Sequence, residues 1–232
     1  MSDFARHLPL SQRGRQDESG VSAHWGHDMA RMLDALGARL AEGDDDAWQA
    51  ASLRTGCTVH ESVAYLVTRL STSRRQRLGS ISLGLLENLF SLRATEAGIA
   101  RRAGAALSRT DLLEQLRSLA TAAGAGTGHA GIRELETVVV GTLDVSIPLG
   151  LDVPIPPAAS GAVALRRALT APTEIKAVVR GRSLAATDAG WSFGHGPELV
   201  DTAAGLLLFL YGRSNTAPHP RTEAERPPSD AH

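Results

Sequence analysis

Cys57 is the only cysteine of the chain, and it lies directly before a predicted helix. Thr58 and Glu61 have the spacing of a capping box, which marks the start of that helix. The positive end of a helix favours the thiolate, which is the nucleophilic form of cysteine. Cys57 is therefore a candidate nucleophile. The alternative, which we expect, is a small buried apolar side chain, the more usual role of a free cysteine.

The histidines offer imidazole, a common metal ligand. His24 and His27 are three residues apart on one predicted helix, and His60 lies near the start of the next. His129 precedes a later helix, but glycines separate it from that helix. His195 stands between two glycines, as expected for a turn residue. We expect these side chains to be solvated surface groups rather than a metal site.

Arg213 and Tyr65 each have two interpretations. Arg213 follows the last apolar helix, and its guanidinium suits a dicarboxylate ligand through paired hydrogen bonds. Otherwise it is a favourable cation at a helix C-terminus. Tyr65 lies away from the apolar stripe of its helix, so it either lines a pocket or stands at a bundle edge as an amphipathic aromatic. The residue types alone leave both choices open.

Composition excludes several classes of protein. The chain has 232 residues, enough for one domain with a real core or two small ones, and a net charge of -1 gives no basic footprint for nucleic acid. No apolar run approaches the roughly 20 residues needed to cross a bilayer. The N-terminal residues lack the apolar core of a signal peptide, and one cysteine excludes an internal disulfide. We expect a cytoplasmic protein with no nucleic-acid or membrane partner.

Hydrophobic spacing divides the chain near Pro148. Before it, apolar residues three and four apart predict amphipathic helices that pack as an antiparallel bundle over residues 22–150. These helices are expected to begin near Ser22, Thr58, Leu78, Ser108 and Ile132.

A smaller mixed subdomain is expected over residues 151–213. It comprises an extended linker, a helix, three short strands and an apolar closing helix, at 151–157, 161–170, 174–180, 182–187, 190–194 and 201–211. Residues 1–21 and 214–232 are expected to be disordered tails.

Four blocks of sequence resemble the mycothiol-dependent maleylpyruvate isomerase family. They are residues 48–66 (WQAASLRTGCTVHESVAYL), 141–150 (GTLDVSIPLG), 186–198 (ATDAGWSFGHGPE) and 203–213 (AAGLLLFLYGR). Each block alone is weak evidence, but together, in the family's order, they are fairly specific. The resemblance implies a mainly α fold, a DinB-like four-helix bundle followed by a small α/β C-terminal subdomain. It also implies mycothiol, the thiol of actinobacteria, and a divalent metal held between bundle helices.

The chain departs from the family where the metal would bind. Tyr65 stands where the family has its first histidine. The later acidic residue and histidine fall on Glu136 and Val140 in one alignment register, and on Thr137 and Gly141 in the other. Neither register supplies a histidine, and a tyrosine seldom binds zinc or nickel. We therefore expect no bound metal.

The resemblance also assigns roles to four residues. Arg213 matches an arginine that serves the family in catalysis, and Tyr65, Glu136 and Asp144 are expected to bind substrate or thiol. The chain is thus expected to be a thiol-dependent isomerase or transferase acting on a small acidic metabolite, with a degraded metal site. The alternative is a non-catalytic ligand-binding or structural bundle derived from the family. A small molecule is the expected partner, and a second copy of the chain is a further candidate.

Overall fold

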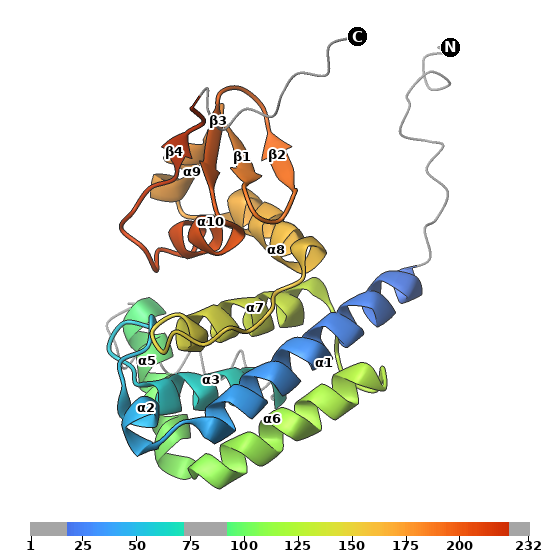
Figure 1. Ribbon diagram of the computed structural model, residues 1–232, viewed down its shortest axis with the longest axis vertical. Coiled ribbons are helices and arrows are strands. Elements are labelled where there is room, and N and C mark those ends of the chain that lie inside the picture. Colours follow the sequence, from blue (N-terminus) through green and yellow to red (C-terminus); the bar gives the residue numbers. More distant parts are fainter. Residues whose placement is uncertain (1–17, 72–91, 223–232) are drawn as a thin grey trace, which may run out of the picture.

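The protein is described by a computed structural model that covers residues 18–71 and 92–222. Helices dominate these residues, and one small four-stranded sheet lies in the C-terminal part. Figure 1 shows the larger group of helices at one end of the molecule and the sheet at the other. Within the described ranges, no helix is long and apolar enough to cross a membrane.

Four helices surround the larger core. They are α1 (Glu18–Glu42), α3 (Val59–Ser71), α6 (Arg109–Gly124) and α7 (Ile132–Ser146). Helices α1 and α6 lie side by side (Figure 1). Helix α7 packs against α1 and α3, and α3 also packs against α6, so the four helices share one core. The buried side chains are those at three- and four-residue spacing, including Met32, Leu36, Leu116 and Leu135.

Caps explain where two of these helices begin. At the start of α3, the backbone N–H of Thr58 donates to Glu61 Oε2 at 2.9 Å, and that of Glu61 donates to Thr58 Oγ1 at 3.2 Å. Ser108 and Asp111 form the same reciprocal pair at the start of α6. The capping box expected at Thr58 and the helix start expected near Ser108 are confirmed. The short helix α2 (Asp45–Gln49) lies before α3, and α5 (Leu92–Ala106) packs against α3.

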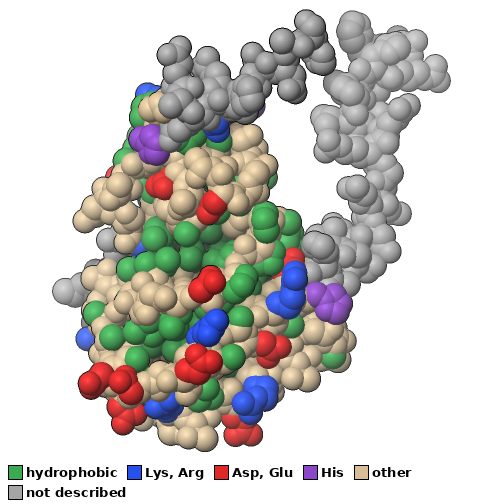
Figure 2. Space-filling model, in the orientation of Figure 1, with side chains coloured by type: hydrophobic (Ala, Val, Ile, Leu, Met, Phe, Trp, Pro, Cys, Tyr) green, Lys and Arg blue, Asp and Glu red, His purple; other side chains and the backbone are tan. Residues whose placement is uncertain are grey.

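The C-terminal part combines helices with the sheet. Helix α8 (Pro157–Thr170) follows an extended stretch and packs against α7 and α10 (Ala203–Leu210). The sheet has the order β2-β1-β3-β4, with strands Ser192–Gly194, Ser183–Ala186, Glu198–Asp201 and His219–Pro220. Strands β1 and β3 are parallel, and the other pairs are antiparallel. Figure 2 shows hydrophobic side chains gathered over the middle of one face, between the sheet and the lower helices.

Three expectations from the sequence differ from the structure. The strand expected at 174–180 is wrong, because this segment forms helix α9 (Thr173–Val179). Its apolar residues Ile175 and Val179 are four apart, so a helix places both on the side that packs against the core, whereas Val178 is exposed. The first helix begins at Glu18 rather than near Ser22, so it includes the last residues of the expected N-terminal tail. The expectation of a disordered tail from residue 214 is wrong at β4, which pairs with β3. The helix start expected near Leu78 lies outside the described residues.

Candidate functional site

Asp144 is the centre of a buried charged cluster. It lies near the C-terminal end of α7 and is fully buried. Its Oδ1 accepts a hydrogen bond from Arg213 Nε at 2.8 Å, and its Oδ2 accepts from Arg213 Nη2 at 3.2 Å and from Arg54 Nη2 at 3.1 Å. Arg213 follows α10, whereas Arg54 lies in the loop before α3. The cluster therefore joins three distant parts of the chain.

Backbone contacts hold the loop that carries Arg54. Gly56 has a φ of +73°, a left-handed conformation that glycine adopts at little cost. This turn allows the N–H of Cys57 to donate to the carbonyl oxygen of Arg54 at 3.0 Å. The N–H of Leu53 donates to the carbonyl oxygen of Asp144 at 2.9 Å. The loop is thus fixed to the same turn of α7 that its arginine side chain contacts.

Tyr65 lies directly against Arg54. Its side chain is buried, with an exposed fraction of 6%, and it packs with Cys57 and two alanines of α5. The guanidinium carbon of Arg54 is 3.9 Å from the centroid of the phenol ring, within range of a cation–π interaction. Burial raises the pKa of the Tyr65 phenol, and the carboxylate of Glu96 raises it further. Tyr65 is therefore neutral at physiological pH.

Glu96 of α5 completes the cluster on its solvent side. Its Oε2 accepts a hydrogen bond from Arg54 Nη1 at 3.1 Å. The exposed fraction of the side chain is 43% for Glu96, 7% for Arg54 and 0% for Asp144. Burial raises the pKa of Asp144, while the positive charges of Arg213 and Arg54 act in the opposite direction. The positive charges of the two guanidiniums equal the negative charges of the two carboxylates. Both guanidiniums offer N–H donors that match carboxylate oxygens.

Three of the four residues expected in the site meet here, and one does not. Tyr65, Asp144 and Arg213 belong to a single cluster because Arg54 contacts Tyr65 and shares Asp144 with Arg213. Glu136 lies eight residues before Asp144 on α7 and has other partners. Its Oε1 accepts from the hydroxyl of Tyr211 at 2.8 Å, and its Oε2 accepts from Arg166 Nε at 2.7 Å.

The Glu136 cluster has a consequence for Tyr211. Burial raises the pKa of the Tyr211 phenol, and the negative charge of Glu136 raises it further. The phenol therefore stays protonated and acts as a hydrogen-bond donor. The guanidinium carbon of Arg167 lies 4.7 Å from the centroid of the same ring. This second cluster joins α7, α8 and the end of α10, and we assign it a structural role.

The residues at the family's metal-binding positions do not fit a metal. A Cβ at Gly141 would lie 2.9 Å from Leu66 Cδ1, so Leu66 fills the space that a ligand side chain would need. The hydroxyl of Thr137 donates to the carbonyl oxygen of Arg133 at 2.9 Å. Across the described parts of the chain, no group of three His, Cys, Asp or Glu side chains is close enough to hold an ion.

Cys57, the candidate nucleophile, and His60, a candidate metal ligand, both have packing roles. Cys57 is buried, and burial raises the pKa of its thiol even though Arg54 lowers it. Its position before the helix therefore does not produce a thiolate. Nε2 of His60 lies 3.1 Å from the carbonyl oxygen of Gly104 and 3.0 Å from that of Leu107, so the ring joins α3 to the end of α5.

Sequence reasoning missed two members of the cluster, Arg54 and Glu96. Arg54 stands within the first block that resembles the family, at a position where the pattern of that family has a cysteine. Glu96 lies 42 residues further along the chain. No local signal marks either residue, because each is defined by a partner from another element.

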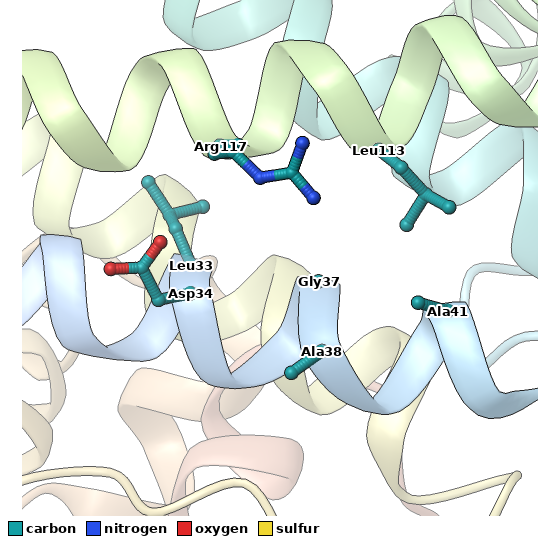
Figure 3. A pocket seen from close by; sticks show the side chains of 7 residues that line it. All are labelled: Leu33, Asp34, Gly37, Ala38, Ala41, Leu113 and Arg117. Atoms are coloured by element: carbon teal, nitrogen blue, oxygen red, sulfur yellow. The ribbon is translucent and has the colours of Figure 1, made fainter.

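A surface cavity of about 160 Å³ lies elsewhere, between α1 and α6. Figure 3 shows that Leu113 and Arg117 approach it from α6, opposite Leu33 and Asp34 of α1. Small residues of α1 line the remainder. No residue of the Asp144 cluster contributes to it, so we do not assign the cavity to the same site.

Comparison with known proteins places the chain in no family. No family model, no curated protein and no solved structure matches it.

Proposed function

We propose that this protein is a thiol-dependent isomerase or transferase that acts on a small acidic metabolite, with mycothiol as the thiol. The observation that supports the proposal is the cluster itself. Tyr65, Asp144 and Arg213 were selected by resemblance alone, yet Arg54 joins them in one place. The DinB-like bundle and the family membership belong to the same proposal, as does action in the cytoplasm.

The roles of the chain's own residues follow from their contacts. Arg213 and Arg54 are the groups that would bind a carboxylate of the metabolite, because a guanidinium offers a fork of N–H donors. Asp144 is a positioning residue, since it holds both guanidiniums in place. The neutral phenol of Tyr65 packs beneath Arg54 and limits its movement. Mycothiol, when bound, would supply the nucleophilic sulfur, and no step is assigned to a metal.

The test is an activity measurement with maleylpyruvate and mycothiol. We expect turnover that requires the thiol and is lost in Arg213→Ala. The matched control is Arg39→Ala, which removes an exposed arginine of α1 and should leave the rate unchanged. Mycothiol should also raise the midpoint of thermal unfolding, because a ligand that binds only the folded state stabilises it. No turnover together with no change in the midpoint would refute the proposal.

A second candidate is a non-catalytic ligand-binding or structural bundle. Arg213 favours it, because two of its nitrogens already bind the fully buried carboxylate of Asp144. A guanidinium that is already paired with a buried carboxylate can stabilise the fold without binding any ligand. In that case Arg213→Ala lowers the free energy of unfolding, and neither mycothiol nor maleylpyruvate changes the unfolding midpoint of the unmodified protein.

A further inference from the structure

The contact between Arg54 and Glu96 differs from the other ion pairs of the cluster. Asp144 is fully buried and is held by three hydrogen bonds from two arginines. Glu96 accepts one hydrogen bond from Arg54, at 3.1 Å, its carboxylate also lies beside the phenol of Tyr65, and its side chain has an exposed fraction of 43%. A half-exposed carboxylate keeps much of its hydration, so Glu96 loses less than Asp144 would when its ion pair separates. Glu96 is therefore the member of the cluster that another anion can replace most easily on Arg54.

We propose that the carboxylate of Glu96 occupies the position on Arg54 that a ligand's carboxylate would take. The site binds a small carboxylate-bearing ligand when the side chain of Glu96 rotates away from Arg54 into the solvent. The inference rests on the proposed function only in the class of ligand, an acidic metabolite. It adds that Glu96 competes with the ligand for Arg54, and this competition sets how tightly the ligand binds.

Charge balance supports this arrangement. Arg54 and Arg213 carry two positive charges, and Asp144 neutralises one of them. Without Glu96 the cluster therefore keeps one net positive charge, at an arginine whose side chain has an exposed fraction of only 7%. Arg69 adds a further cation, with its guanidinium carbon 5.7 Å from the centroid of the Tyr65 ring. A buried cation requires a partner anion, and a ligand carboxylate meets that requirement.

The guanidinium of Arg54 also has unused capacity. Its Nε is buried and has no hydrogen-bond partner within the described residues. Its position is fixed by the Tyr65 ring on one side and by Asp144 on another. An arginine that is already oriented loses little freedom when a second carboxylate binds, which favours a specific site over a loose surface contact.

Calorimetric titration with maleate, a small dicarboxylate, tests the proposal. The variants are Glu96→Ala, which removes both the charge and the side chain, and Glu96→Gln, which removes the charge but keeps the shape. The control is Glu114→Ala, which removes an exposed carboxylate from α6. At low ionic strength we expect Glu96→Ala to bind maleate about tenfold more tightly than the unmodified protein, Glu96→Gln to lie between them, and Glu114→Ala to be unchanged.

Several results would decide against the competitor role. Equal maleate affinity in the unmodified protein and in both Glu96 variants would overturn it, as would an equal gain in Glu114→Ala. If Glu96→Ala does not fold, as judged by circular dichroism, Glu96→Gln decides alone. The outcome is separable from the proposed enzyme activity. If the Glu96 variants bind maleate more tightly but the protein shows no thiol-dependent turnover, the binding site is supported and the proposed enzyme activity is contradicted. If there is thiol-dependent turnover but maleate binding is unchanged in the variants, only the role of Glu96 is contradicted.

Discussion

At the scale of single residues, Asp144 is the shared counter-charge of two arginines from distant parts of the chain. The carboxylate is fully buried and accepts hydrogen bonds from both Arg54 and Arg213. The arrangement depends on Asp144, because its removal leaves two arginines without the buried carboxylate that they share. The same dependence makes the cluster sensitive to isosteric changes that alter charge but not shape.

Asp144→Asn should therefore lower the free energy of unfolding by about 3–5 kcal/mol, since two guanidiniums lose their buried counter-charge. Urea denaturation followed by circular dichroism measures the change. Asp34→Asn, which alters an exposed carboxylate on α1, is the control and should change the free energy by less than about 0.5 kcal/mol. A loss at Asp144 as small as that at Asp34 would contradict the proposed role.

The Cys57 thiol should make stability depend on pH only in the alkaline range. Burial raises the pKa of its thiol above the ordinary value of 9.0. The unfolded chain then loses the thiol proton at a lower pH than the folded chain, so the free energy of unfolding falls as the pH rises above about 9. Cys57→Ala should fold, keep any activity and show a shallower decline there. Tyr65 and Tyr211 remain in both proteins, so identical pH profiles would show that the thiol is not the cause.

At the scale of elements, α3 and α7 approach closely at one point. Leu66 of α3 lies against Gly141 of α7, and a Cβ on that glycine would be 2.9 Å from Leu66 Cδ1. Gly37 of α1 differs, because a Cβ there would only reach ordinary contact with Leu116 at 3.9 Å. Both glycines lie inside helices, so the pair separates the effect of packing from the effect of helix propensity.

Gly141→Ala should destabilise the protein by about 1–3 kcal/mol, because the added methyl group overpacks the contact with Leu66. Gly37→Ala should instead stabilise it by about 0.5–1 kcal/mol, because alanine is the better helix former. Thermal or urea unfolding of the two variants gives the comparison. Stabilisation by both substitutions would mean that α3 and α7 are less closely packed than the structure indicates.

The same two helices carry the positions where the family holds its metal. We expect protein prepared without a histidine tag to contain well below one equivalent of zinc or nickel by elemental analysis, because these positions offer at most one carboxylate and a neutral tyrosine. Tyr65→His with Val140→His should raise the metal content. The alternative pair, Gly141→His with Thr137→Glu, should fold poorly because of Leu66. A full equivalent that is lost on substitution of Tyr65 or Glu136 would prove the expectation wrong.

At the scale of the whole molecule, α7 connects the helical bundle to the C-terminal part. Two residues that follow α10 bind side chains of α7: Tyr211 binds Glu136, and Arg213 binds Asp144. Arg166 of α8 adds a second bond to Glu136. The two parts also share one apolar core, which includes residues of α7, α8 and α10. We therefore expect them to unfold together.

Tyr211→Phe tests this connection. The loss of the hydrogen bond to Glu136 should lower the free energy of unfolding by about 1–2 kcal/mol while the protein still unfolds in one transition. Thr121→Ala is the control, because it removes an exposed hydroxyl whose bond stays within α6. Hydrogen exchange should show equal destabilisation in the bundle and in the sheet. A loss of protection confined to the sheet would mean that the two parts unfold independently.

Part of this structure could be predicted from the sequence because its causes are local. Apolar residues three and four apart predict helices α1, α3, α6 and α7, and the three-residue spacing of Thr58 and Glu61 predicts the cap of α3. The change of pattern after Pro148 predicted a mixed C-terminal part. Short apolar segments are ambiguous between helix and strand, so the strand predicted at 174–180 is wrong, and this segment forms α9.

The charged cluster, in contrast, was decided by the tertiary structure. The partners of Asp144 lie 90 and 69 residues away in the chain, at Arg54 and Arg213. Resemblance singled out Arg213 and Asp144, but no spacing in the sequence pairs them or brings in Arg54 and Glu96. Glu136 shows the same limit, since packing against Tyr211 and Arg166 gave it a different set of partners. Ion pairs form where folded elements meet, and that meeting depends on the packing of the whole chain.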